Sequence, residues 1–131
     1  MRTYVLDTHA LVWFLTQPEK LGRRAKRALA DVSAARAQGV VPVCTLLEVT
    51  LLRERQRTRL NVAAIEEAFQ EMPQVRFLAL DHEQAKEYET LSMLTDPFDR
   101  MIVAAARHID APLVTADSVI TDSGLVRVVW D

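Results

Sequence analysis

The chain contains very little cysteine and glycine. Among its 131 residues the only cysteine is Cys44, so no disulfide can form within the chain, and a reducing cytoplasmic location is expected. The three glycines are Gly22, Gly39 and Gly124, and none follows a predicted strand in the pattern of a phosphate-binding loop. The sequence therefore excludes a disulfide-stapled domain and gives no sign of a nucleotide-binding loop.

The chain also lacks a long hydrophobic run and a large excess of charge of either sign. The apolar stretch 4–15 is interrupted by Asp7 and His9 and falls short of the roughly 20 residues that span a bilayer, so no membrane association is expected. The formal net charge is -2, so any nucleic-acid site must be local. Length and composition are typical of one globular domain over 1–131.

Histidine is scarce as well. His9, His82 and His108 are scattered along the chain, have no HExxH-type spacing and lack cysteine partners, which argues against zinc. His9 stands two residues after Asp7. It either lines a groove beside that acid or is a partly buried residue at the start of a helix, and the second interpretation is favoured.

What the chain does contain is a regular alternation of short β-rich runs and amphipathic stretches. Strands are predicted over 3–6, 40–44, 75–80, 112–115 and 126–130, and helices over 10–15, 21–38, 45–52, 61–71, 81–94 and 97–108. Gly39 is expected to end the second helix, and Pro42 is expected near the start of the second strand. Alternating strands and helices predict an α/β fold with a central parallel sheet of about five strands.

Acidic residues recur beside the ends of the predicted strands. Asp7, Glu48 and Asp117 each follow a strand, and Asp99 opens the apolar helix 97–108. The carboxyl ends of parallel strands share one edge of the sheet, so the four carboxylates are expected to converge there. Crowded carboxylates repel unless a cation compensates, and Mg²⁺ or Mn²⁺ is the usual cation of an all-oxygen site. The pattern predicts a metal site suited to phosphodiester hydrolysis.

Three of these acids also have a purely structural interpretation. Asp7 is a suitable N-cap for the helix that follows it. Glu48 completes a Thr-x-x-Glu capping box with Thr45. Asp99 would stabilise the start of its helix through Arg100 or the backbone. Sequence alone leaves both interpretations open for each residue.

Two basic stretches have no assigned role. The predicted helix 21–38 carries a basic face, for which a solvated surface is favoured over phosphate contacts. Four arginines alternate within 53–59, the densest basic patch of the chain, and this pattern is typical of a frayed helix end or a connector.

Four short motifs, spread over nearly the whole chain, resemble those of one known family. They are Val5-Leu6-Asp7-Thr8-His9, Leu47-Glu48, Asp96-Pro97-Phe98-Asp99-Arg100 and Leu113-Val114-Thr115-Ala116-Asp117. Together they resemble the PIN-domain ribonucleases, and in particular the VapC-type toxins of bacterial toxin-antitoxin pairs. The resemblance implies a three-layer α/β/α fold and an endoribonuclease that depends on Mg²⁺ or Mn²⁺.

The resemblance also implies roles for individual residues and for partners. Asp7, Glu48, Asp99 and Asp117 would form the acidic metal site, and Thr115 would support it through its hydroxyl group. Asp96 would be a helix cap or an outer acid of the site, with capping favoured. The implied partners are an RNA substrate, a second copy of the chain in a homodimer, and a cognate antitoxin protein.

Two rival functions remain. A haloacid-dehalogenase-like phosphatase also begins with a strand that ends in a catalytic aspartate, but His9 stands where its second aspartate is expected. A non-catalytic interaction module with the same fold would have no need of four acids. The preference for RNA over single-stranded DNA rests on the family resemblance, because no base-reading motif is present.

Overall fold

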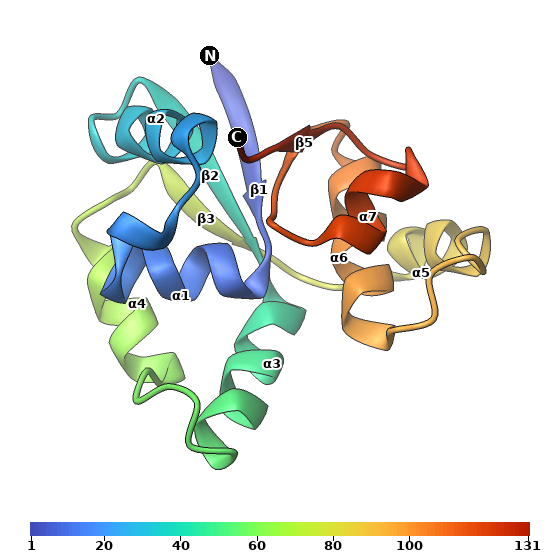
Figure 1. Ribbon diagram of the computed structural model, residues 1–131, viewed down its shortest axis with the longest axis horizontal. Helices are drawn as coiled ribbons and strands as arrows, with labels where there is room; N and C mark the ends of the chain where they lie inside the picture. The colour runs from blue at the N-terminus through green and yellow to red at the C-terminus, as the bar shows by residue number, and fades with distance from the viewer.

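A five-stranded parallel sheet forms the centre of the computed structural model, which describes all residues from 1 to 131 (Figure 1). Its strands are β1 (Arg2–Leu6), β2 (Ala37–Pro42), β3 (Val75–Leu78), β4 (Leu113–Val114) and β5 (Val128–Val129). They lie in the order β3-β2-β1-β4-β5, and every neighbouring pair is parallel. The predicted sheet is confirmed, and β1 lies at its middle.

Helices cover both faces of this sheet, which gives the three-layer α/β/α arrangement (Figure 1). They are α1 (Thr8–Thr16), α2 (Arg23–Ser33), α3 (Val43–Glu54), α4 (Val62–Gln70), α5 (His82–Glu89), α6 (Pro97–His108) and α7 (Ser118–Ser123), with a short 3₁₀ turn, η1 (Pro18–Lys20). The sequence did not predict α7. No helix combines the length and the apolar character needed to cross a membrane.

The alternation of side chains along β1 divides the core in two. Tyr4 and Leu6 point into a cluster built with α1, α2 and α4, whereas Val5 belongs to a cluster built with α6 and α7. Because successive residues of a strand face opposite sides, both faces of β1 are buried. Each fully buried side chain of this size contributes about 1.5–3 kcal/mol relative to exposure. The central strand therefore fixes the position of whatever follows Leu6.

The boundary between α2 and β2 differs from its prediction. The helix ends at Ser33, and Gly39 lies inside β2 rather than at the end of the helix. A Cβ at Gly39 would lie 3.2 Å from Val32 Cγ1, so the glycine permits the close approach of α2 to the sheet. Pro42 is the last residue of β2, not one near its start, and its missing N–H is tolerated where the ladder ends.

The alternative interpretation of Thr45 and Glu48 as a capping box is wrong. Helix α3 begins two residues earlier, at Val43, and Pro42 occupies its N-cap position. The Thr45 hydroxyl instead donates a hydrogen bond of 2.8 Å to the Pro42 carbonyl. Glu48 is thus in the second turn of α3, where capping makes no demand on its carboxylate.

Three helix ends adopt a left-handed conformation without glycine. Ala35, Gln56 and Asp110 have φ angles of 59°, 59° and 52°. After α3, the amide of Gln56 donates to the Arg53 carbonyl at 2.9 Å and the amide of Arg57 donates to the Leu52 carbonyl at 2.8 Å. These two bonds form a Schellman motif, which usually has glycine at this position. The arginine-rich connector therefore begins with an ordered turn rather than a frayed helix end.

A candidate metal centre at the carboxyl edge of the sheet

Asp7 is held rigidly where β1 ends and α1 begins. Its backbone amide donates to the Val114 carbonyl at 3.1 Å, which continues the pairing of β1 with β4. Its Oδ1 accepts a hydrogen bond from the Ala10 amide at 2.8 Å, so Asp7 is the N-cap of α1. Only 8% of the residue is exposed. The capping interpretation is therefore correct, but it occupies only one of the two carboxylate oxygens.

The second oxygen of Asp7 connects it to the end of β4. Asp7 Oδ2 accepts a short hydrogen bond from the hydroxyl of Thr115, which is fully buried directly after β4. The same hydroxyl oxygen accepts a hydrogen bond from the amide of Asp117 at 3.0 Å. Asp117 in turn caps α7 by accepting from the Ile120 amide at 2.9 Å. Thr115 thus joins two of the predicted site acids.

Glu48 is connected to the same centre by a residue that the sequence did not single out. The hydroxyl of Thr8 donates to Glu48 Oε1 at 2.5 Å, and Thr8 is only 2% exposed. Because Thr8 directly follows Asp7, the start of α1 orients an acid from α3 as well as its own. A threonine next to a strand-end acid was the available sequence signal, but its partner 40 positions away was not visible.

Asp99 lies in the first turn of α6, half-buried, and its carboxylate has no hydrogen-bond partner within the chain. The contact with Arg100 expected as its structural role is absent. The guanidinium of Arg100 lies over the Tyr88 ring, 4.3 Å from its centroid, and its Nε donates to the Tyr88 carbonyl at 2.8 Å. Asp99 is therefore the one acid of the four that no neighbour fixes.

The four acids lie close enough to influence one another electrostatically. Burial raises the pKa of Asp7 to about 6, against the opposing effect of the Thr115 hydrogen bond. Burial, followed by the charges of Asp117, Asp96, Glu48 and Asp7, raises the pKa of Asp99 to about 7. Carboxyl groups that share a partly buried edge resist ionising together unless a cation compensates.

The donor set fits a hard divalent cation. All the acids offer oxygen ligands, and no cysteine or histidine side chain joins them in this network. No three of these groups are drawn together into a finished set of ligands. Uncompensated carboxylates repel one another, and the unpartnered Asp99 is the group best able to move toward a cation.

The remaining predicted residues are placed around this centre. Asp96 caps α6, since its Oδ1 accepts from the amides of Phe98 and Asp99 at 2.9 and 3.0 Å, and the favoured capping role is confirmed. His9 is exposed rather than partly buried, and its ring lies 5.6 Å from that of Trp13. The arginine-rich stretch 53–59 comprises the last two residues of α3 and the connector after them (Figure 1).

Comparison with known proteins identifies the fold and the family. The family model of the PIN domain matches residues 4–123. No curated protein sequence matches the chain.

Several solved structures share the fold at low sequence identity. VapBC2 from Rickettsia felis bound to a promoter DNA fragment is 14% identical, with a TM-score of 0.67, and the alignment covers 98% of this chain and 99% of the other. DNA-bound VapBC from Salmonella typhimurium is 17% identical, with a TM-score of 0.66 and coverage of 98% and 97%. VapC20 from Mycobacterium tuberculosis, a sarcin-ricin loop cleaving toxin, is 21% identical, with a TM-score of 0.64 and coverage of 96% and 98%.

The parallel sheet covered on both faces, with acids gathered at its carboxyl edge, defines an α/β protein of the three-layer class. Within that class, the chain belongs to the PIN domain family.

Proposed function

We propose that this protein is an endoribonuclease that depends on Mg²⁺ or Mn²⁺ and acts in the cytoplasm as the toxin of a toxin-antitoxin pair. Asp7, Glu48, Asp99 and Asp117 are the proposed metal ligands and catalytic residues. When bound, a divalent cation activates water and neutralises charge on the phosphate that is attacked. Membership of the PIN family and the VapC fold support this function.

The observation that carries the proposal is the pair of buried hydroxyls of Thr8 and Thr115. Thr8, the residue next to Asp7, donates to Glu48, while Thr115 donates to Asp7 and accepts from the backbone amide of Asp117, so acids from three separate elements are held side by side. A structure that used these acids only as helix caps would have no need to link them. Hydroxyl donors that orient carboxylates are the usual support of metal ligands.

Each of the chain's own residues has a distinct task in this proposal. Thr8 and Thr115 are positioning residues, because they hold Glu48 and Asp7 without contacting substrate. Asp7 supplies a rigid ligand through Oδ2, and Asp99 supplies an adjustable one. No protein nucleophile is required, since water attacks the phosphodiester.

The direct test is RNA cleavage by purified protein with Mg²⁺ or Mn²⁺ and with a chelator. Asp7→Asn and Asp99→Asn are expected to lower the rate at least a hundredfold, because each removes a ligand charge. Asp81→Asn is the matched control: Asp81 also caps a helix, α5, but lies beside His108, at the other end of α6 from Asp99. Cleavage that survives Asp7→Asn and Asp99→Asn, or cleavage unaffected by chelation, would contradict the proposal.

Partners are proposed on the same basis. The VapBC structures from Rickettsia felis and Salmonella typhimurium are complexes, and we infer a cognate antitoxin protein and a homodimer for this chain as well. Leu47 and Leu51 support this, because they lie one turn apart on α3 and are 59% and 36% exposed. Co-expression with a small protein encoded next to this chain is expected to suppress RNA cleavage.

The rival interaction-module function makes opposite predictions. It requires neither cation affinity nor RNA cleavage, and the same Asp7→Asn and Asp99→Asn variants would leave partner binding unchanged. A metal-dependent phosphatase would cleave phosphate monoesters and spare RNA, so a monoester substrate assayed in parallel separates the two hydrolases.

A further inference from the structure

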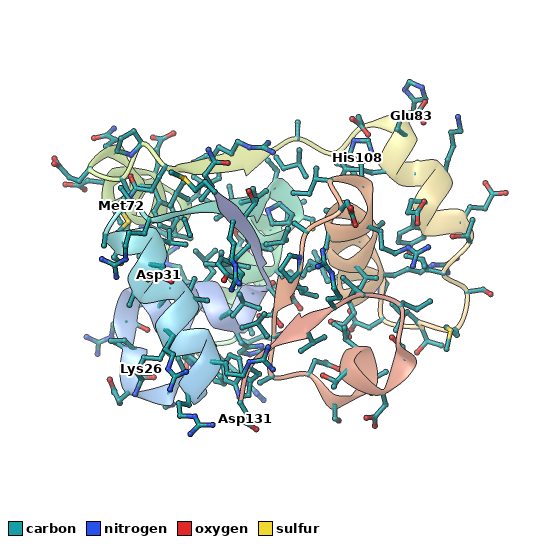
Figure 2. All side chains as sticks on the ribbon, turned by 90° about the horizontal axis from the view of Figure 1, so that it is seen from above. Lys26, Asp31, Met72, Glu83, His108 and Asp131 are labelled. Carbon is teal, nitrogen blue, oxygen red and sulfur yellow. The ribbon has the colours of Figure 1, made fainter.

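The amino edge of the sheet, opposite the acidic centre, is basic. A hollow of about 980 Å³ opens there, where β1 begins beside α2 and ahead of β4 and β5. Figure 2 looks onto this side of the molecule, with α2 carrying Lys26 and Asp31. Five arginines line the hollow, from four separate parts of the chain: Arg2, Arg24, Arg27, Arg76 and Arg127. All five are exposed.

The positive charge of this hollow is only partly neutralised within the chain. Its two acidic residues are Asp31 and Asp110. Asp31 is already paired with Arg36, outside the hollow, at 2.9 Å. Asp110 is fully exposed, and its Oδ1 lies 4.0 Å from Arg127, the limit of an ion pair.

The other four arginines of the hollow take part in no ion pair of the chain. Guanidinium groups are the side chains best suited to phosphate, because their planar fork donates two parallel hydrogen bonds. The hollow is therefore suited to an anion that carries phosphate groups.

We propose that this hollow binds the phosphodiester backbone of RNA at a distance from the bond that is cut. The spread of the arginines favours a chain of phosphates over a single small anion. Arg76 and Arg127 belong to β3 and the approach to β5, the two outer strands, which lie four strand spacings, or about 19 Å, apart. One phosphate ion cannot reach across that span, whereas successive nucleotides can.

The acidic centre gives a physical reason for a second contact surface. Crowded carboxylates repel RNA before a cation binds, and the chain's net charge is negative. Binding free energy must then come from a basic surface elsewhere. Arg2, one of the arginines of the hollow, lies at the start of β1, and Asp7 follows the end of that five-residue strand, so the two residues are about 17 Å apart. RNA long or folded enough to reach both edges is expected to bind more tightly than a short oligonucleotide.

The experiment measures binding without cleavage. In the Asp7→Asn background, the affinity for a fluorescent structured RNA is measured by anisotropy over a range of salt concentrations. Arg24→Gln with Arg27→Gln removes two charges that line the hollow. Arg23→Gln with Lys26→Gln removes two charges from the same helix that do not. All four side chains are exposed, so equal melting temperatures are expected for the two double variants.

The double variant Arg24→Gln with Arg27→Gln is expected to raise the Kd for RNA about tenfold and to reduce the slope of log K against log salt by roughly 2. The control variant Arg23→Gln with Lys26→Gln is expected to change this Kd less than twofold. Equal effects of the two pairs, or no effect of either, would overturn the proposal. Arg127→Gln provides an independent check from another element and is expected to weaken binding in the same sense.

Competition identifies the ligand. Unlabelled RNA is expected to displace the probe at far lower phosphate concentration than pyrophosphate does, and polyglutamate is expected to displace it poorly. Equal displacement by pyrophosphate would make this a small-anion site, and equal displacement by polyglutamate would make it a site for an acidic protein segment. Either result overturns the proposal.

The proposed RNA binding in the hollow rests on the proposed function, in which RNA is the substrate. Experiments can nevertheless contradict RNA binding in the hollow and RNA hydrolysis separately. In active protein, Arg24→Gln with Arg27→Gln is expected to raise KM for the structured RNA and to leave kcat unchanged. Cleavage of a dinucleotide, which is too short to reach Arg24 or Arg27, is expected to be unaffected. Metal-dependent cleavage with no change in RNA binding or KM would overturn the hollow alone, whereas hollow-dependent binding without cleavage would overturn the hydrolase.

Discussion

The two edges of the sheet differ in both charge and construction. The carboxyl edge carries four acids, and the buried hydroxyls of Thr8 and Thr115 hold three of them, Glu48, Asp7 and Asp117, by hydrogen bonds. The amino edge carries five exposed arginines that few partners hold. A net charge of -2 conceals this separation. The hydrogen-bonded carboxylates have a defined geometry, which suits the proposed catalysis. The exposed arginines attract anions without fixed geometry, which suits the proposed binding of RNA.

The largest difference between the edges is expected when a threonine is replaced by valine at each edge, and the quantities compared are cleavage rate and stability. Thr115→Val leaves Oδ2 of Asp7 buried without a donor. The expected result is a 10- to 100-fold loss of cleavage and destabilisation by about 1–3 kcal/mol. The measurements are kcat and urea unfolding.

Thr3→Val at the amino edge is the matched control. The Thr3 hydroxyl donates only an exposed hydrogen bond of 3.3 Å, to Gln38 Oε1. Its loss is expected to change stability by less than about 0.5 kcal/mol. Similar losses from both threonine variants would remove the contrast between the edges.

A smaller effect is expected from pH in the absence of metal. The pKa values of Asp7 and Asp99 are raised to about 6 and about 7. The folded state therefore binds these protons more tightly than the unfolded chain, whose carboxyls titrate near 4. Stability is highest below pH 4 for these two groups and falls as pH rises toward 7.

Asp99→Asn removes part of this penalty. In the presence of a chelator it is expected to raise the melting temperature by a few degrees at pH 8, since about 1 kcal/mol corresponds to roughly 4 °C in a domain of this size. At pH 4 the difference is expected to vanish. A difference in melting temperature that does not depend on pH would contradict a raised pKa for Asp99 in the folded protein.

The smallest effect concerns the backbone near the amino edge. Ala35, two residues after the end of α2, has a φ of 59°, a conformation that costs a residue with a Cβ about 1–2 kcal/mol. Ala35→Gly is therefore expected to stabilise the fold by up to about 1 kcal/mol while leaving RNA cleavage and binding unchanged. Thermal unfolding checks the gain, and a loss of stability would mean that the turn is not strained.

The positions of several acids at the carboxyl edge could be predicted from the sequence, because the residues that indicate them are close together in the chain. An acid placed after a β-rich run predicts a position at the end of a strand, and Asp7 and Asp117 are found there. Pro97 after Asp96 predicts a helix start, which Asp96 indeed caps. Parallel topology then brings the ends of β1 and β4 to one edge, so the proximity of Asp7 and Asp117 needed no tertiary detail.

The parts that were missed depend on contacts between distant segments. The bond from Thr8 to Glu48 joins α1 to α3, and only the packing of those helices reveals it. Pro42 was misplaced because strand propensity does not distinguish the first residue of a strand from the last. The arginines of the hollow come from four parts of the chain, so no single sequence motif predicts the basic edge.

Calorimetric titration with Mn²⁺ tests the central claim most directly. Wild-type protein and Asp81→Asn are expected to bind Mn²⁺ with the same affinity and to release protons near pH 6, because the raised pKa values of Asp7 and Asp99 leave both partly protonated there. Asp99→Asn and Asp7→Asn are expected to lose that binding. Equal Mn²⁺ binding by all four proteins would contradict a metal site at the carboxyl edge of the sheet.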